Sequence, residues 1–222
     1  MFEESCALKQ RIGDLDGVAN SQHSCALVQL CLGRLAEARA TISAVLVASE
    51  DLGERRSRAH FLDSAAMIAL VEGDLDGARR FVTEAAEAAA GMAEPGLLTS
   101  IALHRALAEL LAGDIPAAQR DADLAGEQTS RGGTWVSAGT LDTLAVTACI
   151  ALASGDAAGA AAGAAELAGQ AASAGFVLWE RAAGRIAAVA SAARAGAGTP
   201  DPCRYPALIY VDRLIPADGR RS

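Results

Sequence analysis

The stretch that decides the fold reads LVEGDLDGA at residues 70–78, and it recurs as LLAGDIPAA at residues 110–118. Each copy places an alanine five residues after a central glycine. The same glycine returns at Gly33 and Gly155, so the glycines at 33, 73, 113 and 155 are 40, 40 and 42 residues apart. Such a fixed period is typical of one structural unit copied in tandem.

The residues around these four glycines agree as well. A leucine lies three residues before each glycine, an alanine seven before it and another alanine five after it. The leucine and the first alanine are four residues apart and therefore share one helix face. The glycine can adopt the left-handed conformation that ends a helix. We expect each repeat to form two antiparallel helices that cross at the second alanine. The agreeing residues are Leu30, Leu70, Leu110 and Leu152; Ala26, Ala66, Ala106 and Ala148; and Ala38, Ala78, Ala118 and Ala160.

A second series of helix ends is expected midway between the first. Its glycines are Gly13, Gly53, Gly133 and Gly175, with Ala93 at the place of the missing member. An acidic residue often follows the turns of both series, where its carboxylate can cap the next helix and meet the positive end of the helix dipole. The expected caps are Asp14, Glu54, Asp74, Glu94, Asp114 and Asp156.

Together these signals predict an all-α array of about ten helices over residues 1–195. The repeats are expected at about 15–52, 55–91, 95–131 and 134–174, with half-repeats at 2–12 and 176–195. Residues 196–222, which contain several prolines and glycines, would form a separate tail. The tail could be poorly ordered or lie across the final helix; it could be a docking segment for another chain, or a short strand or helix.

The spacing of small residue, glycine and alanine resembles the tetratricopeptide repeat, whose usual period is 34 residues. The longer period resembles the arrays in large bacterial signal-responsive ATPase and transcription regulators. The resemblance covers about residues 3–195 and implies a right-handed α-solenoid of antiparallel helical hairpins. It also implies a concave groove, lined by the first helix of each hairpin, that holds a protein or peptide segment.

The resemblance places groove residues 13, 10 and 6 positions before each glycine. These positions include polar residues mainly in the first two repeats, whereas later repeats offer a more apolar groove. The candidate groove residues are Asn20, His23, His60, Asp63, Met67, Ser100, Leu103 and Asp142.

Catalytic and metal-binding motifs are missing from the sequence. The three histidines do not occupy equivalent repeat positions, and there is no HExxH, GxSxG or GK[ST] motif. The five cysteines include no CxxC pair, and we expect them to be buried free thiols, with a disulfide or metal role as the alternative. We therefore expect no enzyme, no metal and no cofactor.

Charge and hydropathy narrow the choice of partners. The net charge of −8 repels phosphate backbones, so nucleic-acid binding by this segment is not expected. No apolar run reaches the roughly 18 residues that a membrane span needs. There is no secretory signal, so the expected compartment is the cytoplasm.

The sequence thus favours a non-enzymatic scaffold that binds a protein or peptide, as the regulatory or sensor array of a bacterial signalling or transcription-control protein. One alternative is a domain that senses a small-molecule effector. Another is self-association: the helix at 2–12 resembles the second helix of a hairpin and lacks its partner. Such a start suggests a part of something longer, a face that meets a partner (for example in a homodimer), or a frayed helix that serves as its own cap.

Overall fold

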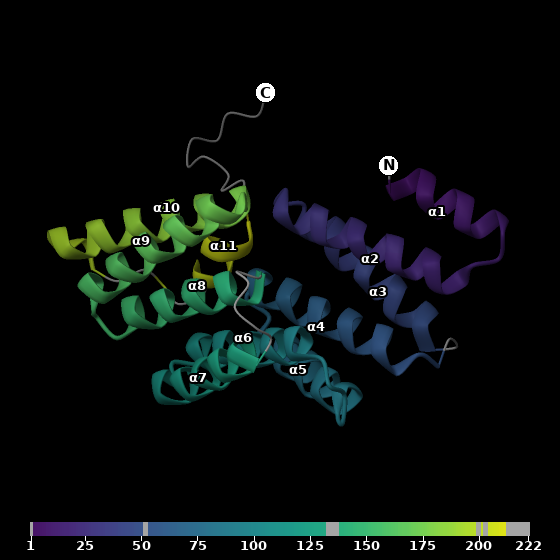
Figure 1. Cartoon of the computed structure of the whole chain (residues 1–222), viewed down its shortest axis with the longest axis horizontal. Helices are drawn as coiled ribbons and strands as arrows, with labels where there is room; N and C mark the ends of the chain where they lie inside the picture. The colour runs from purple at the N-terminus through teal and green to yellow at the C-terminus, as the bar shows by residue number, and fades with distance from the viewer. Residues whose placement is uncertain (1, 51–52, 132–137, 199–200, 202–203, 212–222) are drawn as a thin grey trace.

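The computed structural model describes residues 2–50, 53–131, 138–198, 201 and 204–211. These residues form helices joined by short turns and contain no strand (Figure 1). In chain order the helices are α1 (Phe2–Arg11), α2 (Leu15–Cys31), α3 (Leu35–Glu50), α4 (Arg55–Glu72), α5 (Leu75–Ala89), α6 (Pro95–Leu111), α7 (Ile115–Arg131), α8 (Ala138–Ala153), α9 (Ala157–Ala174), α10 (Val177–Ala192), a π-helical segment η1 (Ala193–Ala197) and α11 (Tyr205–Tyr210).

The helix ends fall on the predicted glycines, with one exception. Glycines 13, 33, 53, 73, 113, 155 and 175 all have positive φ, between 66° and 82°. The prediction for Ala93 is wrong: α5 ends at Ala89, and Gly91 takes the left-handed conformation with φ of 80°. An alanine at positive φ would be strained, so the nearest glycine makes the turn two residues earlier. Gly133 lies outside the described residues.

Aspartates cap the helices, but the two glutamates do not. Asp14, Asp74 and Asp156 each accept a hydrogen bond from the backbone N–H three residues on, and Asp114 accepts the equivalent bond from Ala117. No such bond forms at Glu54 or Glu94, so the cap prediction is wrong there. A short carboxylate reaches back to its own helix start, whereas these longer glutamate side chains bond to other side chains.

The repeat residues form the core. The three agreeing sets, one of leucines and two of alanines, are all at most 2% exposed, as the contact between the two helices of each hairpin requires. Alanine at the crossing lets the two backbones approach closely, and the leucines fill the space between hairpins. The predicted all-helical solenoid of antiparallel hairpins is thereby confirmed.

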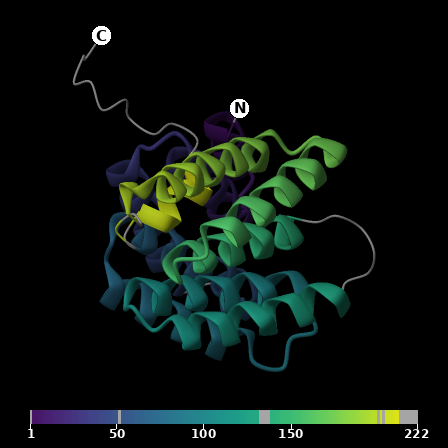
Figure 2. The same cartoon turned by 90° about the vertical axis from the view of Figure 1, so that its left-hand side faces the viewer.

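The helices form an inner and an outer row. Each helix packs on the next one in the chain, but α2, α4, α6, α8 and α10 also pack on one another in that order. Among the described residues, neighbouring outer helices such as α5 and α7 make no comparable contact with each other. Figure 2 shows α8–α10 stacked over α6 and α7. The stack therefore curves with its even-numbered helices on the inside, whereas the right-handed sense of the superhelix stays a prediction.

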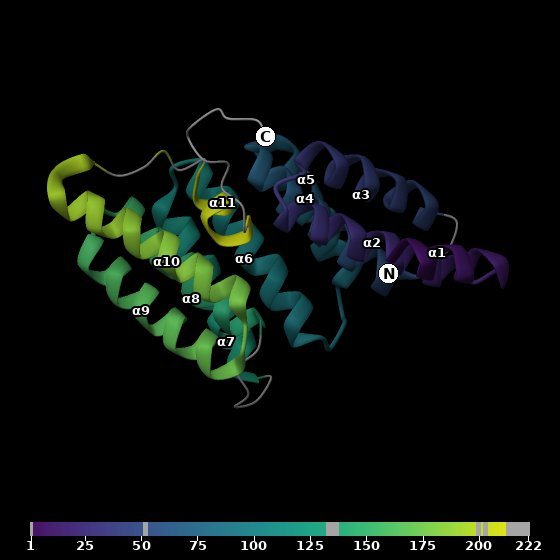
Figure 3. The ribbon, with the colours of Figure 1, turned by 90° about the horizontal axis from the view of Figure 1, so that it is seen from above.

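The chain turns back after α10 and places α11 on the inner row. Gly196 and Gly198 have positive φ at this reversal. α11 packs on α10, α8 and α4, and Figures 1 and 3 show it between the first and last hairpins. Of the possibilities open for the tail, its described part is thus a short helix, and it lies against the array.

No helix within the described ranges is both long and apolar enough to cross a membrane.

Candidate functional site

The inner helices and α11 together line an open pocket of about 300 Å³, here called the inner pocket. Its residues come from six helices that are far apart in sequence, because the repeats place equivalent positions side by side. The lining residues are His23, Leu27, Leu30 and Cys31 of α2; His60, Asp63, Ser64 and Met67 of α4; Ser100 and His104 of α6; Ala138 and Asp142 of α8; Leu178 and Trp179 of α10; and Tyr210 of α11.

Asp63 connects α4 to α6 at the floor of the inner pocket. The side chain is buried, and each carboxylate oxygen accepts one hydrogen bond. Ser100 Oγ donates to Oδ2 over 2.6 Å, and His104 Nδ1 donates to Oδ1 over 2.7 Å. The charge of Asp63 is therefore satisfied by its neighbours, as a buried carboxylate requires.

His104 is the positive member of this buried pair. Burial alone would lower its pKa, but the charge and hydrogen bond of Asp63, together with the charge of Asp142, outweigh burial and raise the pKa above its ordinary value. Its ring meets Tyr210 edge-on, with the ring centroids 5.7 Å apart. Asp63 thus favours the protonated form of the ring, which links α6 to α4 and contacts α11.

Asp142 is the second carboxylate of the inner pocket, and it is less well compensated. Its Oδ1 accepts a hydrogen bond of 3.0 Å from Trp179 Nε1, which links α8 to α10. Burial raises the pKa of Asp142 to about 6, although the Trp179 bond and the charge of His104 act in the opposite direction. This carboxylate therefore carries a negative charge at neutral pH without an ion-pair partner among the described residues.

Two further histidines face the same pocket. His23 Nε2 and Ser64 Oγ share a hydrogen bond of 2.7 Å between α2 and α4. Burial and the nearby charge of His60 lower the pKa of His23 to about 4, so its ring is neutral at pH 7. His60 Nε2 lies 3.3 Å from Glu94 Oε2, and Glu94 also forms an ion pair with Arg56.

The structure brings together most of the residues that the groove pattern selected. His23, His60, Asp63, Met67, Ser100 and Asp142 all line the inner pocket. Asn20 does not: its amide donates to the backbone and carboxylate oxygens of Asp16, one turn earlier on the exposed side of α2. Leu103 is 1% exposed and belongs to the core between helices.

The pocket residues that were missed include Ser64, His104, Trp179 and Tyr210. Ser64 and His104 share a repeat position, nine residues before their glycines, so comparing that position between repeats could have found them. Trp179 follows Asp142 by 37 residues rather than by the repeat length. Tyr210 lies beyond the array, and no sequence signal places it here.

The His23–Ser64 pair lacks two features of a nucleophilic site. A neutral histidine next to a serine hydroxyl resembles part of a nucleophilic site, but a base with a pKa of about 4 is weak. Ser64 also lies in the middle of α4, where backbone N–H groups are bonded within the helix and cannot stabilise an oxyanion. Among the residues that the structure describes, no group of His, Cys, Asp and Glu side chains could hold a metal ion.

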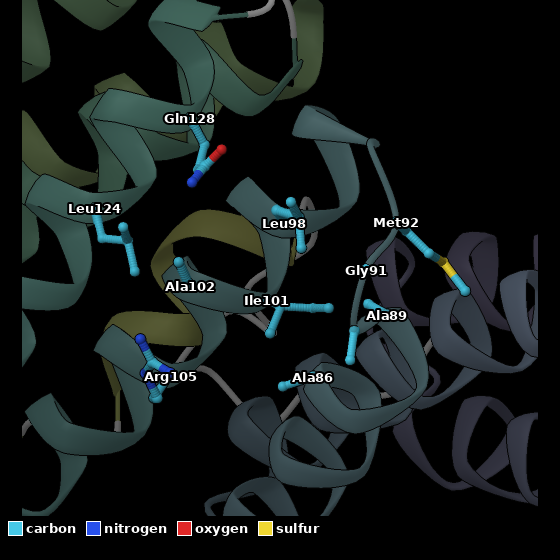
Figure 4. Close-up of a pocket in the computed structure, with 11 residues that line it drawn as sticks. Ala86, Ala89, Gly91, Met92, Leu98, Ile101, Ala102, Arg105, Leu124 and Gln128 are labelled. Atoms are coloured by element: carbon cyan, nitrogen blue, oxygen red, sulfur yellow. The ribbon is translucent and has the colours of Figure 1, made fainter.

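A second hollow of about 230 Å³ lies between the end of α5, α6 and α7 (Figure 4). Its walls are mostly apolar, with Leu98, Ile101 and Leu124 around the opening. The guanidinium of Arg105 donates a hydrogen bond of 2.6 Å to Asp121 Oδ1. This hollow therefore offers little directed chemistry compared with the inner pocket.

In the comparisons with known proteins, no family model matches the chain, and no curated protein matches it. The likeness to tetratricopeptide arrays therefore stays an interpretation of the residue pattern.

Proposed function

We propose that the chain is a non-enzymatic scaffold whose inner face binds a segment of a partner protein, as the regulatory or sensor array of a signalling or transcription-control protein. The observation that supports this most is the position of α11. This segment of the chain already occupies the inner row in the way a bound peptide would.

The contacts of α11 are those of a docked peptide. Tyr205, Leu208 and Ile209 are nearly or fully buried, although the helix has six residues. Arg185 of α10 donates to the carbonyl oxygens of Leu208 over 2.8 Å and of Ile209 over 3.4 Å. The inner face thus supplies both apolar contacts and a backbone-directed hydrogen bond donor, the two elements of peptide recognition in a groove.

One feature of α11 favours exchange with another segment. The Tyr205 hydroxyl is buried without a hydrogen-bond partner among the described residues. An unsatisfied buried hydroxyl costs about 1–3 kcal/mol, and that cost opposes the docking of α11. A partner segment that avoids it could compete with α11 for the same surface.

A labelled peptide with the sequence of residues 204–211, RYPALIYV, tests the proposal in fluorescence anisotropy. In the wild-type chain α11 competes at an effective concentration in about the millimolar range, so the peptide binds weakly. Ile209→Asp places a charge in the buried contact and should release α11. We expect this variant to bind the peptide at least about tenfold more tightly than wild type.

Controls separate release of α11 from general damage. Arg204→Asp introduces the same residue at the exposed helix start and should behave like wild type. Tyr205→Asp should reproduce the effect of Ile209→Asp, with helix content checked by circular dichroism. Equal binding to all four proteins, or no binding to either released variant, would contradict peptide binding on this face.

A second candidate function, sensing of a small-molecule effector, is favoured by the inner pocket itself. Its volume lies at the lower end of the range for ligand sites, and its polar groups converge from several helices. A thermal-shift screen of metabolites tests this, because a ligand that binds only the native state raises the melting temperature. A genuine ligand of this pocket should lose its effect in His60→Ala.

We also propose self-association of two copies through α1. Leu8, Ile12 and Leu15 are at least 60% exposed and form an apolar patch where α1 meets α2. Within the described part of the chain, α2 is the one helix on which α1 packs extensively. A second copy that presents the same patch would bury both.

A further inference from the structure

The charges that face the inner pocket are unequally matched. Asp63 has two hydrogen-bond donors, Ser100 and His104, whereas Asp142 has one, the indole of Trp179. Among the described residues that line the pocket, only the histidines can carry a positive charge, and His104 is already bonded to Asp63. The pocket therefore has an excess of negative charge at Asp142.

Burial raises the free-energy cost of this unbalanced negative charge. The pKa of Asp142 is raised to about 6 because its carboxylate is shielded from water and the charge of His104 compensates it only in part. An anion in the pocket would add repulsion from both carboxylates, and a neutral ligand would leave the cost unchanged. A cation next to Asp142 would offset it, since opposite charges interact more strongly in a desolvated site.

The walls favour an ammonium group on an apolar stem. Trp179 and Tyr210 line the same pocket as Asp142, and aromatic rings attract cations as well as methylene groups. Leu27, Met67 and Leu178 complete an apolar wall. At about 300 Å³ the space suits a single extended side chain or a small amine rather than a large metabolite.

We propose that the inner pocket binds a primary alkylammonium group, with its charge beside Asp142 and its methylene stem against Trp179 and Met67, which stay in place when a partner segment replaces α11. The site belongs to the binding face proposed above, and the proposal rests on that function. The same chemistry is presented by a lysine side chain of a partner segment and by a free alkylamine.

Titrations with small probes test the charge requirement. n-Pentylamine, 1-pentanol and pentanoate have five carbon atoms each and differ in charge, and Trp179 fluorescence in a Trp135→Phe background reports on the pocket. Pentylamine should bind at least about tenfold more tightly than either of the others. Equal binding of pentanol or pentanoate, or no binding of pentylamine, overturns the proposal.

Variants test the position of the charge. Asp142→Asn keeps an oxygen acceptor for Trp179 and removes the negative charge. The variant should therefore bind pentylamine at least about tenfold more weakly than wild type, while the protein stays folded. Asp123→Asn, at an exposed position on α7, removes the same charge elsewhere and should have no effect. An unchanged affinity in Asp142→Asn overturns the proposal.

Two further probes distinguish the sources of the ammonium group. N-acetyl-lysine N-methylamide presents a lysine side chain, and the norleucine analogue is its neutral counterpart. Tighter binding of the lysine compound than of pentylamine identifies a partner's lysine, and the reverse identifies a free amine; equal binding of norleucine overturns the proposal. The labelled-peptide experiment has a separate readout, so failure of the ammonium site and failure of the peptide-binding face can be told apart.

Discussion

At the scale of single residues, Asp63 has the largest structural role in the inner pocket. It links α4 to α6 through Ser100 and His104, and both of its oxygens are engaged. A residue chosen as a groove contact is thus also a support for the walls of the groove. A substitution of Asp63 therefore changes the stability of the protein, and a loss of ligand binding in such a variant would not by itself identify a ligand contact.

Asp63→Asn should lower the free energy of unfolding by about 1–3 kcal/mol, because it removes the charge that His104 and Ser100 bond in the buried interior. Urea denaturation followed by circular dichroism measures this change. Asp123→Asn is the matched control at an exposed site and should stay within about 0.5 kcal/mol of wild type. A loss below about 1 kcal/mol in Asp63→Asn would contradict a structural role for the pair.

His23 gives the fold a dependence on pH. Its folded pKa of about 4 lies below the ordinary value of 6.5, so between these pH values the unfolded chain binds more protons and stability falls as the pH falls. The groups that face His23 are Ser64, Phe61, His60 and Asp63 of α4.

His23→Gln should remove this part of the acid sensitivity. Between pH 7 and pH 4 wild type should lose about 2–3 kcal/mol more than the variant. Denaturation at several pH values measures the difference in unfolding free energy between the two proteins. The contributions of the other titrating groups largely cancel in this difference, because both proteins contain them. Parallel pH profiles for the two proteins would show that His23 is not held neutral by the fold.

At the scale of helices, the small residues at the crossings set how closely each hairpin packs. Ala38 is 0% exposed at the crossing of α2 and α3, and its repeat equivalents Ala78, Ala118 and Ala160 are equally buried. There is no space for a larger side chain without moving one helix away from the other.

Ala38→Leu should therefore destabilise the chain by about 1–3 kcal/mol, in spite of leucine's good helix propensity. Ala40→Leu, two residues further along α3 at an exposed position, is the control and should change stability by less than about 0.5 kcal/mol. Thermal and urea unfolding report both values. Similar stabilities of the two variants would argue against close packing at the crossing.

The repeat pattern predicted these elements well because each consensus position has one physical task that recurs in every copy. The leucine fills the space between hairpins, the alanine lets the two helices cross closely, and the glycine ends the helix. The error at Ala93 arose where the spacing was extrapolated to a residue that cannot adopt positive φ, while Gly91 was two positions away. The glutamate caps failed because acidity alone does not provide the short reach of an aspartate.

The candidate site was predictable to the extent that it repeats. His60, Ser100 and Asp142 occupy one repeat position on successive inner helices, so they line up in space. Leu103 was wrong as a pocket residue because α6 presents the next residue, His104, instead. Trp179 and Tyr210 could not be predicted: one departs from the repeat spacing, and the other reaches the pocket only because the chain folds back after α10.

At the scale of the whole molecule, the array has one patch that the described part of the chain leaves uncovered near α1. If two copies meet through this patch, light scattering of wild type should give a dimer, and Leu8→Glu should give a monomer because a charge replaces an apolar contact. Gln10→Glu, an exposed neighbour on α1, should leave the dimer intact. A monomeric wild type would remove this interface.

The central claim is that the inner face of the stack is a binding surface and that α11 is its present occupant. Amide hydrogen exchange of the Ile209→Asp variant, with and without the RYPALIYV peptide, tests it most directly. We expect the peptide to slow exchange in α4, α8 and α10 and to leave exchange in the outer helices α3, α5 and α7 unchanged. Protection confined to the outer helices, or no change in any helix at saturating peptide, would contradict it.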